Sequence, residues 1–337
     1  MRLGLIARCE IARGIAIQSK NFYDNMPVDR VLLVRMPRPD CVVAPDWYQN
    51  ATWASYDDKN HQLDETLVRE WLDGLDVVFT VETPNDWRMP LWCREMGVKL
   101  IIQGNPEFVR HTTDPSIPHP DAWWWPTKWR LDQLPAGKVM PVPMSPVAPA
   151  ASTDDHRLHL THVVGKRAYA DRNGTDLLVQ IMRYVRADVK LSVFGIDGQL
   201  PEFRRQRNIE FDLHPDGVDN KRDLYAGADV LVMPRRYGGL CLPALEAAAS
   251  GLVVMMPDCS PNDELAAVRP AIQHRRPMSF ACGPVLIVDV NTPSFAAEID
   301  NLAQPAALKA AREQQSWMVP YWADWRQCYL DEMESML

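Results

Sequence analysis

The stretch from Arg236 to Asp258 reads RYGGLCLPALEAAASGLVVMMPD and decides the fold. An apolar run at Asp229–Pro234 precedes it and predicts a parallel strand, and Leu252–Met256 predicts the next strand. Between them, a Gly-Gly turn leads into a short Ala-rich helix, which Pro243 opens and Gly251 closes. This order predicts a βαβ unit of a doubly wound α/β fold.

The same stretch has the pattern of a site for an anionic ligand. Gly238 and Gly239 lie between the strand and the helix N-terminus, where backbone N–H groups can meet a negative charge. Glu246, inside the helix, can accept hydrogen bonds from ribose hydroxyls, as an acidic residue does in dinucleotide sites. On this segment alone, the alternative is an ordinary βαβ crossover with a tight turn.

This segment resembles the nucleotide-sugar site of GT-B glycosyltransferases, especially the retaining enzymes of glycosyltransferase family 4. That family's pattern is Glu-Gly-Phe-Gly-Leu-Pro-x-x-Glu-Ala-x-Ala-x-Gly. The positions that match in place are Gly239, Leu242, Pro243, Glu246, Ala247, Ala249 and Gly251. The first Glu of the family's pair falls on Gly238, and Cys241 replaces the second Gly, so the chain departs from the pattern at these two positions.

Other pieces resemble the family in the same order along the chain. They are Val163–Arg167 with Asp171–Leu178, then Leu191–Gly198, then Leu224–Pro234. The matches run from Val163 to Glu264, whereas the N-terminal half matches only in outline. The resemblance implies a GT-B fold, in which two doubly wound Rossmann-like domains face a central cleft and the last helix crosses back to the first domain.

Apolar runs of strand length alternate with helical segments along the chain. In the first half, strands are predicted at Leu3–Ala7, Val31–Val34, Val77–Val81, Leu100–Gln103 and Ala122–Pro126, and helices at Ile15–Asn25, Leu63–Asp73, Pro90–Gly97 and Lys128–Leu134. Segment 35–60, rich in Pro, Asp and aromatic residues, predicts a long loop. A second sheet is predicted from strands at 158–164, 190–195, 208–211, 229–234, 252–256 and 285–288.

The length of 337 residues is sufficient for two domains. A Pro-dense stretch, Val139–Thr153, cannot form a helix interior and predicts an interdomain hinge. We expect an N-terminal Rossmann-like acceptor-side domain over residues 1–145 and a Rossmann-like nucleotide-sugar-binding domain over 146–316. Residues 317–337 are expected to form a helix that packs back on the first domain. Its apolar stripe is Trp317, Tyr321, Trp322, Trp325 and Tyr329.

Composition narrows the class of protein. A hydrophobic content of 47% with 24% charged residues describes a soluble globular chain, and its apolar runs are too short to span a membrane. The net charge of −8 argues against a broad nucleic-acid-binding surface. The seven cysteines are scattered and form no Cys-x-x-Cys pair, which predicts a reduced, cytoplasmic protein.

The resemblance also implies roles for individual residues. Arg167 falls on the family's phosphate-binding Arg, while the family's Lys falls on Asn173, beside Arg172. Many relatives place a His after the fourth strand, where this chain offers only Asn105 or Glu107 to hydrogen-bond a sugar. The candidate catalytic residues are therefore Arg167, Asn105 and Glu107. The candidate donor-binding residues are Gly14, Lys166, Arg172, Gly238, Gly239, Leu240, Leu242 and Glu246.

No cofactor or metal is expected beside the nucleotide-diphosphate-sugar substrate. The chain has no Asp-x-Asp pair near a strand end. His156, His159 and His162 suggest a metal cluster, but the period of two in a strand puts His159 and His162 on opposite faces, and no Cys or carboxylate completes the set. Positive side chains and helix N-termini are expected to meet the diphosphate instead.

These features predict a glycosyltransferase that moves a sugar from a nucleotide-diphosphate-sugar to a hydroxyl acceptor, with retention implied by the resemblance alone. The acceptor is left open as a small molecule, a glycan or a DNA base. A first alternative is a DNA-modifying enzyme, in which Arg35, Arg38, Trp47 and Trp53 meet a flipped hydroxylated base. A second alternative is a non-catalytic nucleotide-sugar-binding protein, because the first family Glu and the His are missing.

Overall fold

The structure, a computed structural model, describes residues 1–8, 14–35, 45–57, 62–108, 114–147, 156–165, 171–195, 198, 200–218, 220–280 and 283–337. The chain divides into two compact units. The first consists of Met1–Ser145 and Pro320–Leu337, and the second of Pro146–Val319. Each unit is an α/β structure built on a parallel sheet, as the sequence predicts.

The first unit contains a parallel sheet of seven strands in the order β3-β2-β1-β4-β5-β6-β7. The strands are β1 (Leu3–Arg8), β2 (Val28–Arg35), β3 (Ala51–Ser55), β4 (Val77–Glu82), β5 (Lys99–Gly104), β6 (Ala122–Trp125) and β7 (Lys138–Val139). The chain builds outward from β1, first to β2 and β3 and then across to β4 and beyond. This order makes the sheet doubly wound, with its switch point between β1 and β4.

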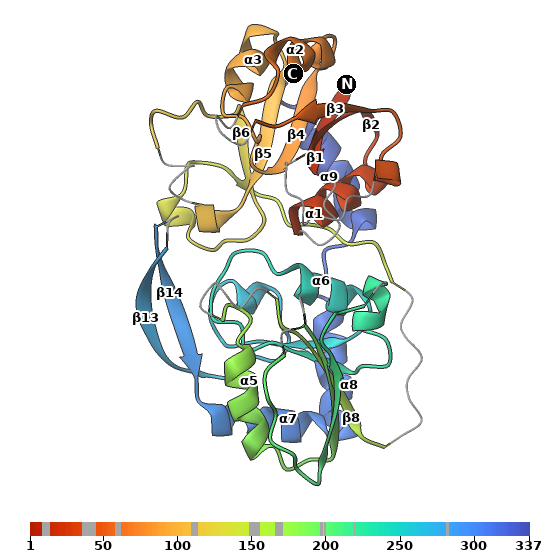
Figure 1. The fold of residues 1–337 in the computed structure, drawn as a ribbon, viewed down its shortest axis with the longest axis vertical. Coiled ribbons are helices and arrows are strands. Elements are labelled where there is room, and N and C mark those ends of the chain that lie inside the picture. Colours follow the sequence, from red (N-terminus) through yellow and green to blue (C-terminus); the bar gives the residue numbers. More distant parts are fainter. Residues whose placement is uncertain are drawn as a thin grey trace. The chain divides into compact units, whose positions relative to one another are not determined.

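Alternating side chains of this sheet form two separate cores. Leu5 and Phe79 face one layer, whereas Ile6 and Val78 face the other. Helices α1 (Gly14–Asn25) and α9 (Trp322–Glu334) cover the first face, and α2 (Glu65–Leu72) and α3 (Met89–Glu95) cover the second (Figure 1). Short 3-10 turns complete the unit at η1 (Pro45–Trp47), η2 (Pro106–Phe108) and η3 (Leu131–Gln133).

The second unit contains a parallel sheet in the order β10-β9-β8-β11-β12 and a separate antiparallel hairpin. The strands are β8 (Leu158–Val163), β9 (Val189–Phe194), β10 (Ile209–His214), β11 (Val230–Val232), β12 (Val253–Met255), β13 (Ile272–Phe280) and β14 (Gly283–Val290). The helices are α5 (Thr175–Ile181), α6 (Leu242–Ala249), α7 (Thr292–Leu302) and α8 (Pro305–Ser316), with 3-10 turns η4 (Met182–Tyr184), η5 (Lys221–Leu224) and η6 (Asn262–Glu264).

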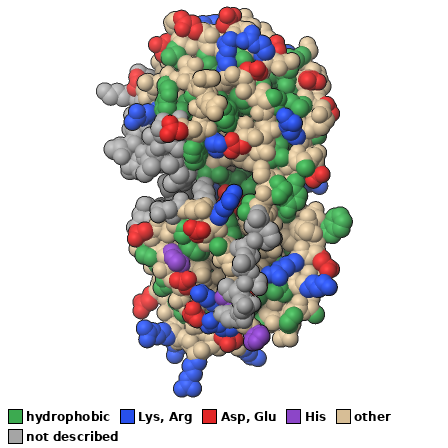
Figure 2. All heavy atoms as spheres, turned by 90° about the vertical axis from the view of Figure 1, so that its right-hand side faces the viewer, with side chains coloured by type: hydrophobic (Ala, Val, Ile, Leu, Met, Phe, Trp, Pro, Cys, Tyr) green, Lys and Arg blue, Asp and Glu red, His purple; other side chains and the backbone are tan. Residues whose placement is uncertain are grey.

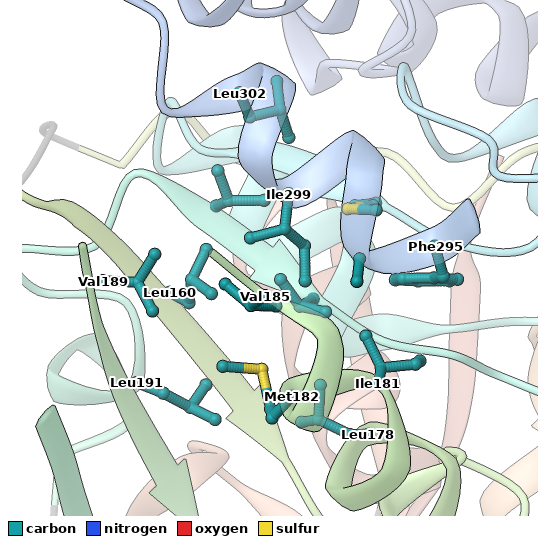
Figure 3. Close-up of a cluster of buried hydrophobic side chains, with 14 of the residues drawn as sticks. Leu160, Leu178, Ile181, Met182, Val185, Val189, Leu191, Phe295, Ile299 and Leu302 are labelled. Carbon is teal, nitrogen blue, oxygen red and sulfur yellow. The ribbon is translucent and has the colours of Figure 1, made fainter. Parts of the chain in front are cut away.

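The core of the second unit lies between its sheet, α5 and α7. Phe295, Ile299 and Leu302 recur at spacings of four and three, so they share one face of α7. In Figure 3 these side chains point toward Ile181 of α5 and Leu160 of β8. All five are almost fully buried, which fixes α5 against the sheet from which the loops of the site emerge.

Four local predictions are wrong. Lys128–Leu134 is no α-helix: it holds only η3, because Arg130 adopts a left-handed φ of 60° and Pro135 follows. The predicted loop 35–60 contains the edge strand β3. Residues 285–288 belong to the β13–β14 hairpin and not to the second parallel sheet. Trp317, placed in the C-terminal stripe, is 90% exposed and lies between α8 and α9.

The surface carries charged side chains of both signs. On the face drawn in Figure 2, basic and acidic groups are interspersed. Among the helices that the structure describes, none is both long and apolar enough to cross a membrane.

Candidate functional site

The second sheet has its topological switch point between β8 and β11. From β8 the chain proceeds to β9 and β10 on one side and returns to β11 and β12 on the other. Ligands of open α/β sheets bind outside the carboxyl ends of the strands at such a point. The loop after β11 holds Gly238 and Gly239, and the described end of the loop after β8 holds Arg172. The two loops touch, since the Arg236 N–H donates to the Arg172 carbonyl at 2.9 Å.

The loop after β8 ends in a tightly constrained turn. Asp171, itself at a left-handed φ of 50°, accepts hydrogen bonds from the N–H groups of Thr175 and Asp176 and so caps α5. Burial raises the pKa of the Asp171 carboxyl above its ordinary value. Gly174 has φ +74°, and a Cβ there would lie 1.9 Å from the Pro234 carbonyl oxygen. The turn therefore packs directly against the segment that follows β11.

A buried histidine joins the two strands beneath these loops. His162 on β8 is fully buried, and its Nδ1 lies 2.8 Å from the Val232 carbonyl oxygen on β11. Because a carbonyl only accepts, Nδ1 carries the proton, and Nε2 accepts from the Thr175 hydroxyl at 2.9 Å. Burial lowers the pKa of His162 to about 4, against the opposing effect of the Val232 hydrogen bond. Both ring nitrogens are thus used within the protein.

Two adjacent arginines follow β11 and have different surroundings. Arg235 is 2% exposed, and its guanidinium donates to the carbonyls of Tyr237 and Leu240 at 2.9 and 2.8 Å. Arg236 turns the other way and forms an ion pair with Asp289 of β14 at 2.6 Å. The first arginine therefore supports the glycine loop from inside, whereas the second ties the hairpin to the sheet.

Glu246 lies on α6 and is half-buried. Tyr225 follows η5, and its hydroxyl donates a hydrogen bond to Glu246 Oε2 at 2.7 Å. Burial first, and then the neighbouring Glu246 carboxylate, raise the pKa of Tyr225 well above its ordinary value, so the phenol stays protonated and remains the donor. One carboxylate oxygen of Glu246 is thereby oriented by the protein.

Three candidate residues lie in the first unit. Gly14 begins α1 after β1, and Asn105 and Glu107 follow β5, so all three lie at the carboxyl edge of that sheet. Asn105 Oδ1 accepts from the Glu107 N–H at 3.3 Å and so stabilises the turn of η2. Glu107 is 7% exposed, and Gly14 is exposed.

The structure therefore brings most second-unit candidates into two touching loops and one helix. Gly238, Gly239 and Leu240 lie in the loop, Leu242 begins α6, and Glu246 follows one turn later. Lys166 and Arg167 lie outside the described residues. The sequence reading missed Arg235 and Tyr225. The available signal for Arg235 was a charged residue directly after the apolar strand segment that ends at Pro234. Nothing in the local sequence pointed from Tyr225 to Glu246.

Comparison with known proteins supports the resemblance. Residues 160–304 match the sequence model of the family described as Glycosyl transferases group 1. No curated protein matches the chain in sequence. Among solved structures, HepE from Anabaena in complex with UDP and glucose matches with a TM-score of 0.68 and 9% identity, over 99% of this chain and 100% of that chain.

Two further structures have the same architecture. The apo form of the lipopolysaccharide outer core galactosyltransferase WaaB matches with a TM-score of 0.61 and 12% identity, over 98% of this chain and 100% of its own. Sucrose-phosphate synthase from Thermosynechococcus elongatus matches with a TM-score of 0.59 and 12% identity, over 99% of this chain and 100% of that one. At such identities these likenesses establish the fold, which is GT-B, as the sequence predicts.

Proposed function

We propose that the protein transfers a sugar from a nucleotide-diphosphate-sugar to a hydroxyl acceptor, because residues 160–304 match the sequence model of the glycosyl transferases group 1 family. Retention of the anomeric configuration is part of the proposal. The proposed sugar transfer is supported by the two loops that touch at the β8–β11 switch point, and by Glu246, which is oriented on the helix that follows.

The proposed roles follow the chemistry of the donor. Glu246 holds the ribose through its carboxylate, since charged acceptors bind hydroxyl donors strongly. The backbone of Gly238–Leu242 contacts the donor. Arg167, with Lys166 or Arg172, meets the diphosphate, whose negative charge grows as its bond to the sugar breaks. No protein carboxylate need act as a nucleophile, because the departing phosphate can accept the acceptor's proton. Asn105, Glu107 and Gly14 are proposed for the sugar side.

A thermal-shift screen of nucleotide-sugars tests the function directly. A ligand stabilises the folded protein by RT ln(1 + [L]/Kd), about 2.7 kcal/mol at a concentration of 100 Kd. UDP-sugars come first because HepE was solved with UDP-glucose. The true donor is expected to shift the midpoint more than its bare nucleotide. Hydrolysis of that donor without an acceptor would exclude a non-catalytic binding protein, and no shift by any nucleotide-sugar would contradict the proposal.

Glu246→Ala is expected to weaken donor binding without unfolding the protein. Loss of hydrogen bonds to a charged acceptor costs about 1.5–3 kcal/mol, which corresponds to an increase in Kd of about 10- to 150-fold. Calorimetry with UDP-glucose measures the change.

Two further variants accompany Glu246→Ala. Tyr225→Phe removes only the hydroxyl that orients Glu246, so a smaller loss of affinity is expected. Glu298→Ala on α7, also half-buried, serves as the control and should leave the Kd unchanged. Parental affinity in Glu246→Ala would remove this residue from the donor site.

Donor binding is expected to be independent of a divalent metal. The sequence lacks an Asp-x-Asp pair, and arginines lie beside the loops of the site. No group of three or more His, Cys, Asp or Glu suited to a metal ion occurs within the part of the chain that the structure describes. The Kd for UDP should therefore agree within about twofold in EDTA and in manganese, given the ordinary scatter of such measurements. Binding or turnover lost in chelator and restored by manganese would contradict this expectation.

A further inference from the structure

Arg235 is a buried cation at the start of the glycine loop. It follows β11 by three residues, is 2% exposed and ranks among the largest fully buried side chains. A charged group inside a protein is costly unless hydrogen bonds replace its water. The family pattern does not account for it, because Arg235 lies between the segments that match, which end at Pro234 and resume at Gly239. Its placement therefore calls for a specific role.

The guanidinium of Arg235 holds both ends of the loop. Nε donates to the Tyr237 carbonyl at 2.9 Å, and Nη2 donates to the Leu240 carbonyl at 2.8 Å. The backbone of Arg235 is also held in place, because the Asn262 side chain donates hydrogen bonds to the carbonyls of Arg235 and Pro257. The rigid fork of an arginine thus sets the orientation of two peptide groups.

These two peptide groups direct their N–H bonds away from the guanidinium. Both peptides are trans, and in a trans peptide the C=O and N–H point in opposite directions. The N–H groups that follow the two carbonyls belong to Gly238 and Cys241. Over the described residues, neither of these N–H groups has an acceptor in the protein. These two donors, which belong to buried residues, therefore point away from the guanidinium at the carboxyl edge of the sheet.

The conformation of Gly238 fits this arrangement. Its φ is 120°, a value that residues with a side chain rarely adopt. A glutamate, which the resembled family has at this position, would be strained in such a loop. The loss of the family Glu and the buried arginine are thus two parts of one loop geometry, held by Arg235 and permitted by Gly238.

We propose that Arg235 is a positioning residue for the donor diphosphate: it turns the N–H groups of Gly238 and Cys241 toward the phosphates. The inference rests on the proposed function. Arg235 does not touch the ligand; it acts through the loop and adds positive charge behind it. Backbone N–H groups directed at a phosphate form a recurrent kind of anion site.

The test separates the diphosphate from the rest of the nucleotide by comparing UDP with uridine. Arg235→Met keeps the length of the side chain without its charge or donors. It is expected to raise the Kd for UDP at least about tenfold, a typical effect of losing charge-assisted hydrogen bonding, while the Kd for uridine stays within about twofold. Arg235→Lys, which keeps the charge but not the fork, should lie between the parent and Arg235→Met. NMR titration measures both ligands.

The control is Arg312→Gln, which removes an ion pair with Asp229 at the opposite end of β11. It should leave the affinities for UDP and uridine at parental values. If Arg235→Met does not fold, Arg235→Lys decides the question by the same comparison. An unchanged affinity for UDP, or an equal loss for UDP and uridine, would overturn the positioning role. A parental protein that binds UDP no better than uridine would overturn the proposed function as well.

Discussion

Gly174→Ala is expected to lower the free energy of unfolding of the second unit by about 3–5 kcal/mol. The left-handed φ of +74° alone costs a residue with a side chain about 1–2 kcal/mol. The new Cβ would also lie 1.9 Å from the Pro234 carbonyl oxygen and 2.5 Å from its carbon. These are backbone atoms, so the chain leaving β11 must move. The contact between the two loops should be lost, and UDP binding with it.

The matched control is Gly198→Ala. Gly198 has the same φ of +74°, but among the residues that the structure describes a Cβ there would meet only an Asp216 oxygen, at 4.0 Å. Its cost should be the conformational part alone, about 1–2 kcal/mol. Trp317 is the one tryptophan of the second unit and is largely exposed, so native-state hydrogen exchange of β8 and β11 amides is the suitable measurement. Equal losses in the two variants would show that the close approach does not constrain the loops.

The second large effect is a loss of stability in acid that depends on His162. Burial lowers its pKa in the folded protein to about 4, against about 6.5 when unfolded. Between these values the unfolded chain binds a proton that the folded chain does not, so stability falls as the pH drops through this window. The shift corresponds to about 3 kcal/mol, fully lost below pH 4.

A comparison of variants isolates this contribution from other titrating groups. His162→Gln can still donate to Val232 and accept from Thr175, and it should be less stable at pH 7 but lose about 3 kcal/mol less than the parent on acidification. The control His156→Gln replaces an exposed histidine just before β8 and should keep the parental pH dependence. Hydrogen exchange of β8 amides at pH 7 and pH 5 provides the measurement, and about 2 kcal/mol of the difference should appear in this interval. Identical pH profiles for His162→Gln and the parent would contradict the assignment.

The sequence predicts the parallel strands well because they are buried on both faces. Val77–Val81 is apolar except for the buried Thr80, and Leu252–Met256 is apolar throughout, a pattern that marks a strand covered on both faces. The edge strand β3 was missed because only Ala54 of its five residues is buried. The apolar run 285–288 resembled a core strand, yet Leu286 is 57% exposed in the hairpin. The hydrophobicity of a short segment does not determine which strand it pairs with in the fold.

Candidate site residues could be chosen from the sequence where a short sequence pattern reflects the backbone geometry. Gly238, Gly239 and Glu246 were chosen from the strand–turn–helix order together with the family resemblance, and the structure places them in the loop and helix after β11. Arg235 could not be assigned, because its role depends on burial and on two carbonyls that its own side chain selects. Tyr225 could not be assigned either, since it meets Glu246 across 21 residues. The contact between Tyr225 and Glu246 arises from packing between elements and has no local signature.

The division of the chain also governs how the protein is made. The first unit is completed only by Pro320–Leu337, where Trp322, Tyr329 and Met333 bury themselves against Phe22 and Phe79. The ribosome makes these residues only after the whole second unit, Pro146–Val319. During synthesis, the part of the apolar sheet face that α9 covers therefore stays exposed while the whole second unit is translated and can fold. Emergence of Pro320–Leu337, and not emergence of the first 145 residues, therefore completes the first unit.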